Sequence, residues 1–115
     1  MKLTLNRREE QEKKLFRTST MYYLDIKLEF TPEEVALIKK HKWDENRIIE
    51  YQNPGGNLIW WTVGEFIKEG HFGKYTSVEE LAYGENQVIE NAKKLKQQLE
   101  AAAGYTSAGP REIDL

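Results

Sequence analysis

An alternation of apolar and polar residues between positions 16 and 30 is the clearest pattern along the chain. Its odd positions are mostly polar or charged. Because successive side chains of a strand point to opposite faces, the alternation predicts a long strand with one buried and one solvated face. A strand over residues 2–8 is predicted before it, and the charged stretch Arg8–Lys14 is predicted to form the hairpin tip. The residues expected on the buried face are Phe16, Thr18, Thr20, Tyr22, Leu24, Ile26, Leu28 and Phe30.

A second hairpin is predicted from residues 47–51 and 58–63, which flank a turn segment with one proline and two adjacent glycines. Trp60 and Trp61 are neighbours in its second strand, so they must point to opposite faces of the sheet. A slip of one residue in the pairing would exchange those faces. The pairing that we predict sets Tyr51 opposite Leu58, Ile49 opposite Trp60, and Ile48 opposite Trp61. It places Trp60, with Ile49, Tyr51 and Leu58, in the core covered by the helices.

Helix-start signals organise the rest of the chain. Thr31-Pro32-Glu33-Glu34 combines an N-cap threonine, a proline suited to the first turn and a glutamate that can close a capping box. A helix is therefore predicted over residues 31–43, and Thr62-Val63-Gly64-Glu65 opens a shorter one that ends at residue 68. A helical stripe of apolar residues follows Ser77, with a candidate break at Gly84 that leaves 85–103 as the continuous part. Between these helices, residues 71–75 are predicted to be a loop.

These elements predict an α+β fold. Two antiparallel β-hairpins are expected to form one sheet, and residues 111–115 are a further candidate strand at its edge. A long C-terminal helix and two shorter helices are expected to pack on that sheet. No repeat or linker interrupts the pattern, so residues 1–115 are predicted to be a single domain.

Composition limits the cellular compartment and the side-chain chemistry that we expect for this chain. Hydrophobic residues make up 39% of the chain and charged residues 31%, which are ordinary values for a globular protein. The lack of cysteine excludes disulfides and thiolate chemistry and fits a reducing, cytoplasmic location. No apolar run approaches the roughly 20 residues of a spanning helix, so we expect no membrane partner.

Candidate catalytic and metal-binding groups are few. The two histidines, His41 and His71, belong to no ligand motif, and no nucleophile stands beside a base in a known pattern. The sequence therefore predicts no catalytic residue, no metal and no cofactor, and hence a protein that is not an enzyme. The alternative is a small enzyme or ligand-binding protein with a pocket around His71, Lys74 and Tyr75.

Nucleic-acid binding is a second alternative, because cations gather on the first predicted hairpin. Acidic residues alternate with them, and the formal net charge of the chain is −2. Phosphate binding requires cations that are not neutralised by neighbouring acids, so the mixture argues against this partner. The cations are Arg7, Arg8, Lys13, Lys14 and Arg17, and the acids among them are Glu9, Glu10 and Glu12.

The leading hypothesis is a small interaction module, such as an inhibitor, an adaptor or a regulatory subunit. It would bind a protein partner, or a second copy of itself, through the sheet face turned away from the helices. Large aromatic side chains are the usual anchors of such interfaces. The alternative is that the chain covers this face itself. The residues predicted to bind the partner are Tyr23, Ile48, Ile59 and Trp61.

Overall fold

The computed structural model describes residues 1–52, 58–104 and 114 and confirms the α+β class. Its strands form two separate antiparallel sheets, so the expectation of one sheet is wrong in that respect. One sheet has three strands in the order β1-β2-β5, and the other pairs β3 with β4. The strands are β1 (Lys2–Lys14), β2 (Arg17–Glu29), β3 (Ile48–Gln52), β4 (Leu58–Thr62) and β5 (His71–Tyr75).

The helices begin where the capping signals predict. Thr31 and Thr62 each accept a hydrogen bond from the amide three residues later, and each donates its own amide to a glutamate carboxylate there. Both capping boxes are therefore confirmed. Lys42, with a left-handed φ of 58°, separates the first two helices. The helices are α1 (Pro32–Lys40), α2 (Trp43–Asn46), α3 (Val63–Lys68) and α4 (Val78–Ala103).

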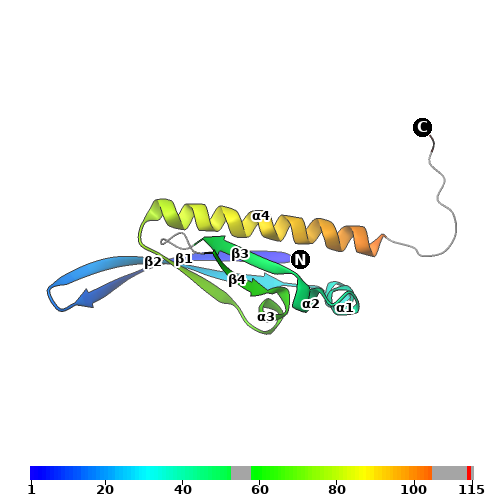
Figure 1. Ribbon diagram of the computed structural model, residues 1–115, viewed down its shortest axis with the longest axis horizontal. Helices are drawn as coiled ribbons and strands as arrows, with labels where there is room; N and C mark the ends of the chain where they lie inside the picture. The colour runs from blue at the N-terminus through cyan, green and yellow to red at the C-terminus, as the bar shows by residue number, and fades with distance from the viewer. Residues whose placement is uncertain (53–57, 105–113, 115) are drawn as a thin grey trace.

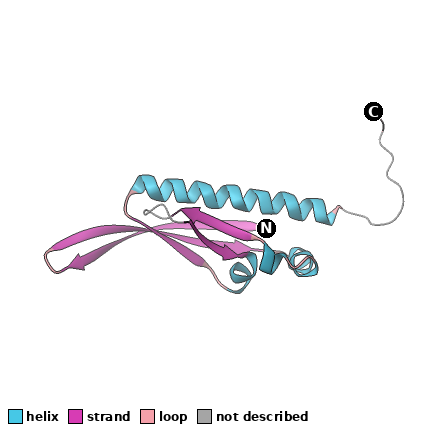
Figure 2. Ribbon diagram, in the orientation of Figure 1, coloured by secondary structure: helices cyan, strands magenta, loops and turns pink. Residues whose placement is uncertain are grey.

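The long helix α4 lies across one side of the molecule, with the strands beneath it (Figure 2). It packs mainly against β3 and β5, and its buried stripe matches the predicted spacing. The predicted break at Gly84 is wrong, because α4 runs through that residue without interruption. Gly84 is buried where the ring of Tyr75 approaches the helix, and any larger side chain would meet that ring. The buried residues of α4 are Leu81, Gly84, Val88, Ala92, Leu95 and Leu99.

The main core lies between the two sheets and the first half of α4. The buried even positions of β2 belong to it, which confirms the alternation at Leu24, Ile26 and Leu28. A second cluster joins the far half of α4 to α1 and α3 through Ile38, Val63, Leu95 and Leu99. The remaining buried members of the main core are Ile49, Tyr51, Phe66, Tyr75, Leu81, Val88 and Ala92.

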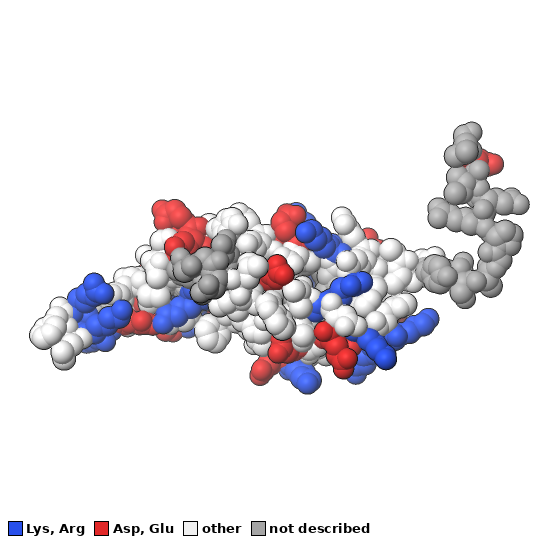
Figure 3. Space-filling model, in the orientation of Figure 1, with Lys and Arg blue, Asp and Glu red and all other residues white. Residues whose placement is uncertain are grey.

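The first hairpin is longer than predicted, and its far end extends beyond the rest of the fold (Figure 1). The charged stretch Arg8–Lys14 is not the tip, because β1 continues through Lys14 and pairs residue by residue with β2. The turn is formed by Leu15 and Phe16 instead. Basic side chains stand just behind that end of the hairpin (Figure 3). Phe16 and Thr18, predicted to be buried, are exposed because none of the other described elements covers this part of the hairpin.

Two other predictions concern residues 71–75 and residues 111–115. The segment His71–Tyr75, predicted as a loop, is β5 and pairs with β2. The candidate strand over residues 111–115 lies outside the described residues, apart from Asp114. Among the helices that the structure describes, none has both the length and the apolar character needed to cross a membrane.

Candidate protein-interaction site

Trp61 and Ile59, two of the predicted partner-binding residues, face the core. The pairing of β3 with β4 sets Ile49 opposite Trp61 and Tyr51 opposite Ile59. The Trp61 ring stacks on Tyr51, with centroids 5.2 Å apart, and on His71, with centroids 4.8 Å apart. Both Trp61 and Ile59 are partly buried against the main core. Most of their surface is therefore already occupied by contacts within the chain.

The predicted pairing of this hairpin is wrong by one residue, and the error exchanges its two faces. Gln52 belongs to β3 and pairs with Leu58, so only residues 53–57 separate the two strands. Trp60, predicted to enter the core, is consequently 56% exposed. Tertiary contacts explain why Trp61 and not Trp60 faces the core. Among the described residues, the rings that a tryptophan can contact lie on the side of the hairpin that meets β5 and α3. There Trp61 also meets Phe66 edge-on, with centroids 5.8 Å apart.

The outer face of β3 and β4 carries an exposed apolar patch, which we call the β4 patch. It consists of Ile48, Leu58 and Trp60, which are 37%, 61% and 56% exposed. The three side chains share one face because alternate residues of a paired strand point the same way. Of the four predicted partner-binding residues, only Ile48 belongs to this patch. The structure thus separates Ile48 from Ile59 and Trp61 by the thickness of the sheet.

Beside the β4 patch, the outer edge of β4 has no strand next to it among the residues that the structure describes. The amide of Val63 donates to the carbonyl of Arg47 at 2.9 Å, so these two opposed residues form a hydrogen-bonded pair between the strands. Hydrogen-bonded and non-hydrogen-bonded pairs alternate along antiparallel strands. The N–H and C=O groups of Leu58 and Trp60 therefore point away from β3, to the open edge. Thr62 has the same orientation, and its amide donates to the capping carboxylate of α3 at 2.7 Å. The open edge is therefore centred on Leu58 and Trp60.

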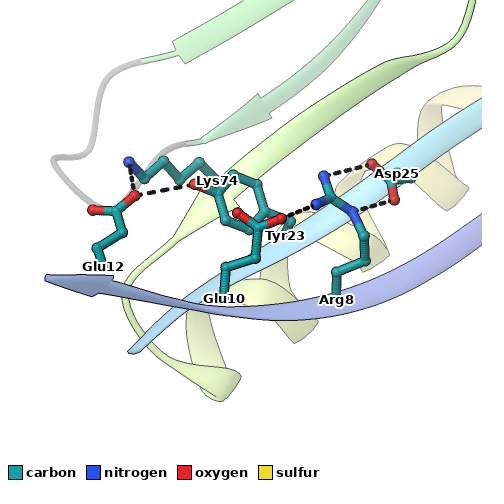
Figure 4. Close-up of polar contacts among 6 residues, drawn as sticks. All are labelled: Arg8, Glu10, Glu12, Tyr23, Asp25 and Lys74. Atoms are coloured by element: carbon teal, nitrogen blue, oxygen red, sulfur yellow. Dashed lines mark hydrogen bonds and ion pairs between the residues drawn. The ribbon is translucent and has the colours of Figure 1, made fainter. Parts of the chain in front are cut away.

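Tyr23, the fourth predicted residue, lies on the other sheet within a network of charged groups (Figure 4). Its hydroxyl donates to Glu12 at 3.1 Å, and Lys74 forms an ion pair with the same carboxylate at 2.6 Å. Arg8 lies over the Tyr23 ring, 4.8 Å from its centroid, and donates to Asp25 at 2.6 Å. The hydrogen bond from Lys74 lowers the pKa of Glu12, with a further contribution from Tyr23. The network satisfies Tyr23 within the chain.

The alternative of an enzyme pocket near His71 depends on that residue being accessible. His71 lies in β5, with its ring 4.8 Å from Trp61 and 4.7 Å from Phe66. Its Nε2 is buried, and none of the described groups hydrogen-bonds to it. A groove of about 310 Å³ between β2 and α3 is lined by Phe66 and its neighbours, and not by His71, Lys74 or Tyr75. The described residues hold no cluster of three potential metal ligands.

Tyr75 is a core residue with an unusual environment. Its side chain is fully buried, and its hydroxyl has no hydrogen-bond partner among the described residues. Burial, with a smaller contribution from Tyr51, raises the pKa of the Tyr75 phenol above its ordinary value. Gly73 and Gly84 leave room for the ring on two sides. We assign Tyr75 a packing role, because it has no access to solvent.

The end of the first hairpin holds the most exposed apolar side chains of the described chain. Leu15 is 88% exposed and Phe16 is 94% exposed. Sequence reasoning missed them because the alternation of β2 placed Phe16 on the buried face. The signal available in the sequence was their position between Lys13-Lys14 and Arg17. That pattern surrounds two large apolar residues with cations on both strands.

Comparison with protein-family models finds no match. Comparisons with curated proteins and with solved structures likewise find no similar protein. The function must therefore be argued from the surfaces of this chain alone.

Proposed function

We propose that the protein is a small interaction module that binds an extended segment of another polypeptide along the open edge of β4. The observation that carries the proposal is Trp60, whose side chain is 56% exposed and whose peptide group points to the open edge. In strand addition, main-chain hydrogen bonds provide affinity and alternate side-chain contacts provide specificity. The β4 patch would supply those side-chain contacts.

The contrast between two open edges supports this assignment. Proteins usually protect an exposed strand edge with charged side chains or proline. The edge strand β1 is protected in this way, since residues 7–10 and 12–14 are all charged. The five residues of β4, Leu58 to Thr62, include no charge and no proline. An edge that lacks such protection and adjoins exposed apolar side chains is suited to binding another strand.

A second copy of the chain is the simplest occupant. Antiparallel pairing that places Leu58 opposite Trp60 of the partner uses the free peptide groups on both sides and needs no other donor. Such an interface is self-complementary, as two-fold symmetry requires. The β4 patch offers three exposed apolar side chains, whereas a standard interface buries about 800 Å² and about 20–30 residues on each partner. Self-association through this edge alone would therefore be weak. A stable complex would need a different partner that also covers the surface next to the β4 patch. A chain that acts as an inhibitor, adaptor or regulatory subunit would bind such a partner.

Sedimentation velocity of the full chain over a range of concentrations tests the self-association. The key variant is Trp60→Lys, which places a charge on the open edge without touching the core. Tyr83→Lys is the matched control, because Tyr83 is 54% exposed on α4, away from β4. The proposal predicts that Trp60→Lys abolishes association and that Tyr83→Lys retains it.

Affinity capture with the same three proteins extends the test to other partners. Any partner should be retained by wild type and by Tyr83→Lys, and lost by Trp60→Lys. Hydrogen exchange at the Trp60 amide should also slow in the complex, because that amide gains an acceptor. A wild-type chain that remains monomeric and captures no partner, or a Trp60→Lys chain that associates normally, would overturn the proposal.

A further inference from the structure

The end of the β1–β2 hairpin has features that neither packing nor turn formation explains. Leu15 and Phe16 are the two residues between the paired strands, since Lys14 pairs with Arg17. Two-residue hairpin turns favour Gly, Asn or Asp, which tolerate positive φ. Neither Leu15 nor Phe16 has a positive φ, so the turn does not require these residues for their backbone. Their side chains also contribute little to the core, because they are almost fully exposed.

Three cations stand directly behind this apolar end. Lys13, Lys14 and Arg17 make no salt bridge with any described residue. The nearest acids are engaged elsewhere, since Glu12 pairs with Lys74 and Glu10 pairs with Arg8. The acids therefore balance the hairpin cations only in part at its end, where Glu12 attracts Lys14 weakly beside its ion pair with Lys74. This surface, which we call the hairpin tip, comprises residues 13–17 and carries a net charge of +3.

We propose that the hairpin tip docks on an anionic lipid surface, with Leu15 and Phe16 entering it and the three cations at the level of the headgroups. Residues in a strand rise about 3.4 Å each, so the cations lie roughly 3–7 Å behind the apolar end. Apolar faces of surface-bound proteins enter lipid to about 5–10 Å, which places cations at this distance among the phosphates. The layered arrangement of the tip fits that geometry.

Two other anionic partners fit the tip less well. A single-stranded nucleic acid would stack a base on Phe16, but it offers nothing to the equally exposed Leu15. An acidic pocket on a protein would need a concave shape matched to the tip, whereas a lipid surface accepts any protruding apolar end. The expectation of no membrane partner rests on the absence of a spanning segment and on the mild charge of the whole chain, and neither observation concerns a local cluster such as the tip. A tip that enters only the surface needs no such segment.

Vesicle sedimentation of the full chain tests the proposal. We expect binding to vesicles of equal parts phosphatidylcholine and phosphatidylserine, and much weaker binding to phosphatidylcholine alone. Replacement of both Leu15 and Phe16 by Asn should reduce binding by about a hundredfold or more, because each buried apolar side chain contributes about tenfold or more. Reversal of all three cations to Glu should also reduce it by about a hundredfold or more, since each cation contributes about fivefold at an anionic surface.

Matched variants separate the tip from general effects. Replacement of Lys93, Lys94 and Lys96 on α4 by Glu changes the net charge by the same amount and should retain more binding than the tip reversal. The chain has no cysteine, so a polarity-sensitive dye can be attached at Leu15→Cys or at Tyr83→Cys. Only the dye at position 15 should report an apolar environment when vesicles are added.

Any of the following results would overturn the proposal. One is the absence of binding to the phosphatidylserine vesicles at low salt. Another is binding that survives both the Asn and the Glu replacements at the tip, or a dye at position 15 that remains in water. The third is tip-dependent binding to a single-stranded oligonucleotide without binding to vesicles, which would assign the tip to nucleic acid instead. Because the tip lies outside the core, far-ultraviolet circular dichroism should be unchanged in all of these variants.

Discussion

Replacement of Gly84 by alanine tests how closely α4 packs against the Tyr75 ring. A Cβ at this position would lie 2.6 Å from Cε1 of Tyr75 and closer still to its hydroxyl. The Tyr75 ring cannot easily yield, because it is fully buried and its centroid lies 5.6 Å from that of Tyr51. Alanine gains about 1 kcal/mol over glycine inside a helix, whereas overpacking costs about 1–3 kcal/mol and occasionally more. Because a new Cβ would overlap the Tyr75 ring directly, the cost should lie at the upper end of that range, and we expect a net destabilisation of about 2 kcal/mol.

Urea unfolding followed by circular dichroism measures this change, with Gly104→Ala as the control. At Gly104 the nearest atom to a new Cβ is a carbonyl oxygen 3.6 Å away, and the backbone is already helical. That variant should change the free energy of unfolding by less than about 0.5 kcal/mol. In a Tyr75→Phe background, Gly84→Ala should cost less by about 0.5–1 kcal/mol, because the nearest clashing atom is gone. If Gly84→Ala is as stable as wild type, the packing argument is refuted.

Three further predictions concern other parts of the fold. Trp61→Ala should lower the free energy of unfolding by about 3 kcal/mol, because it removes a ring stacked in the core, whereas Trp60→Ala should leave it nearly unchanged in the same urea assay. Thr62→Ala should cost about 1 kcal/mol by removing the cap of α3, again measured by urea unfolding, and an unchanged midpoint would contradict the capping box. The Glu12 carboxyl should titrate below its ordinary pKa of 4.5 by NMR, and Lys74→Met should move that pKa back upward. Since the folded pKa is lowered, the pair stabilises the fold above the ordinary pKa, and that contribution is lost as the pH falls through the folded value.

Local chemistry accounts for what the sequence predicted well. The capping boxes at Thr31 and Thr62 each involve residues three positions apart, so they can be recognised without knowing the fold. The stripe of α4 is a periodic property of one helix. The buried face of β2 from Leu24 to Leu28 follows from alternation alone.

The features that the sequence did not predict depend on contacts between distant residues. The pairing of β3 with β4 is decided by the rings beside Trp61, which come from β5 and α3. The segment His71–Tyr75 resembles a loop because Gly73 interrupts it, yet that glycine makes room for Tyr75. The charged half of β1 produces no alternation because its side chains are nearly all exposed, whereas Leu3 and Leu5 in the other half pack against the main core. These contacts explain why the sequence predicts Trp61 in the exposed patch, whereas the structure places Trp60 there. They also explain why the sequence pattern does not indicate the hairpin tip.

The division into two sheets has a consequence for how the molecule opens. Because β3 and β4 share no backbone ladder with the three-stranded sheet, rings and aliphatic side chains hold the two sheets together. The β3–β4 hairpin is thus a candidate for an independent cooperative unit, whose local unfolding need not break the other ladder. Its amides would then exchange through sub-global fluctuations of lower free energy than those that expose β2. A polypeptide bound along β4 would suppress those fluctuations. The first measurable effect of binding would therefore be a change in the cooperativity of unfolding.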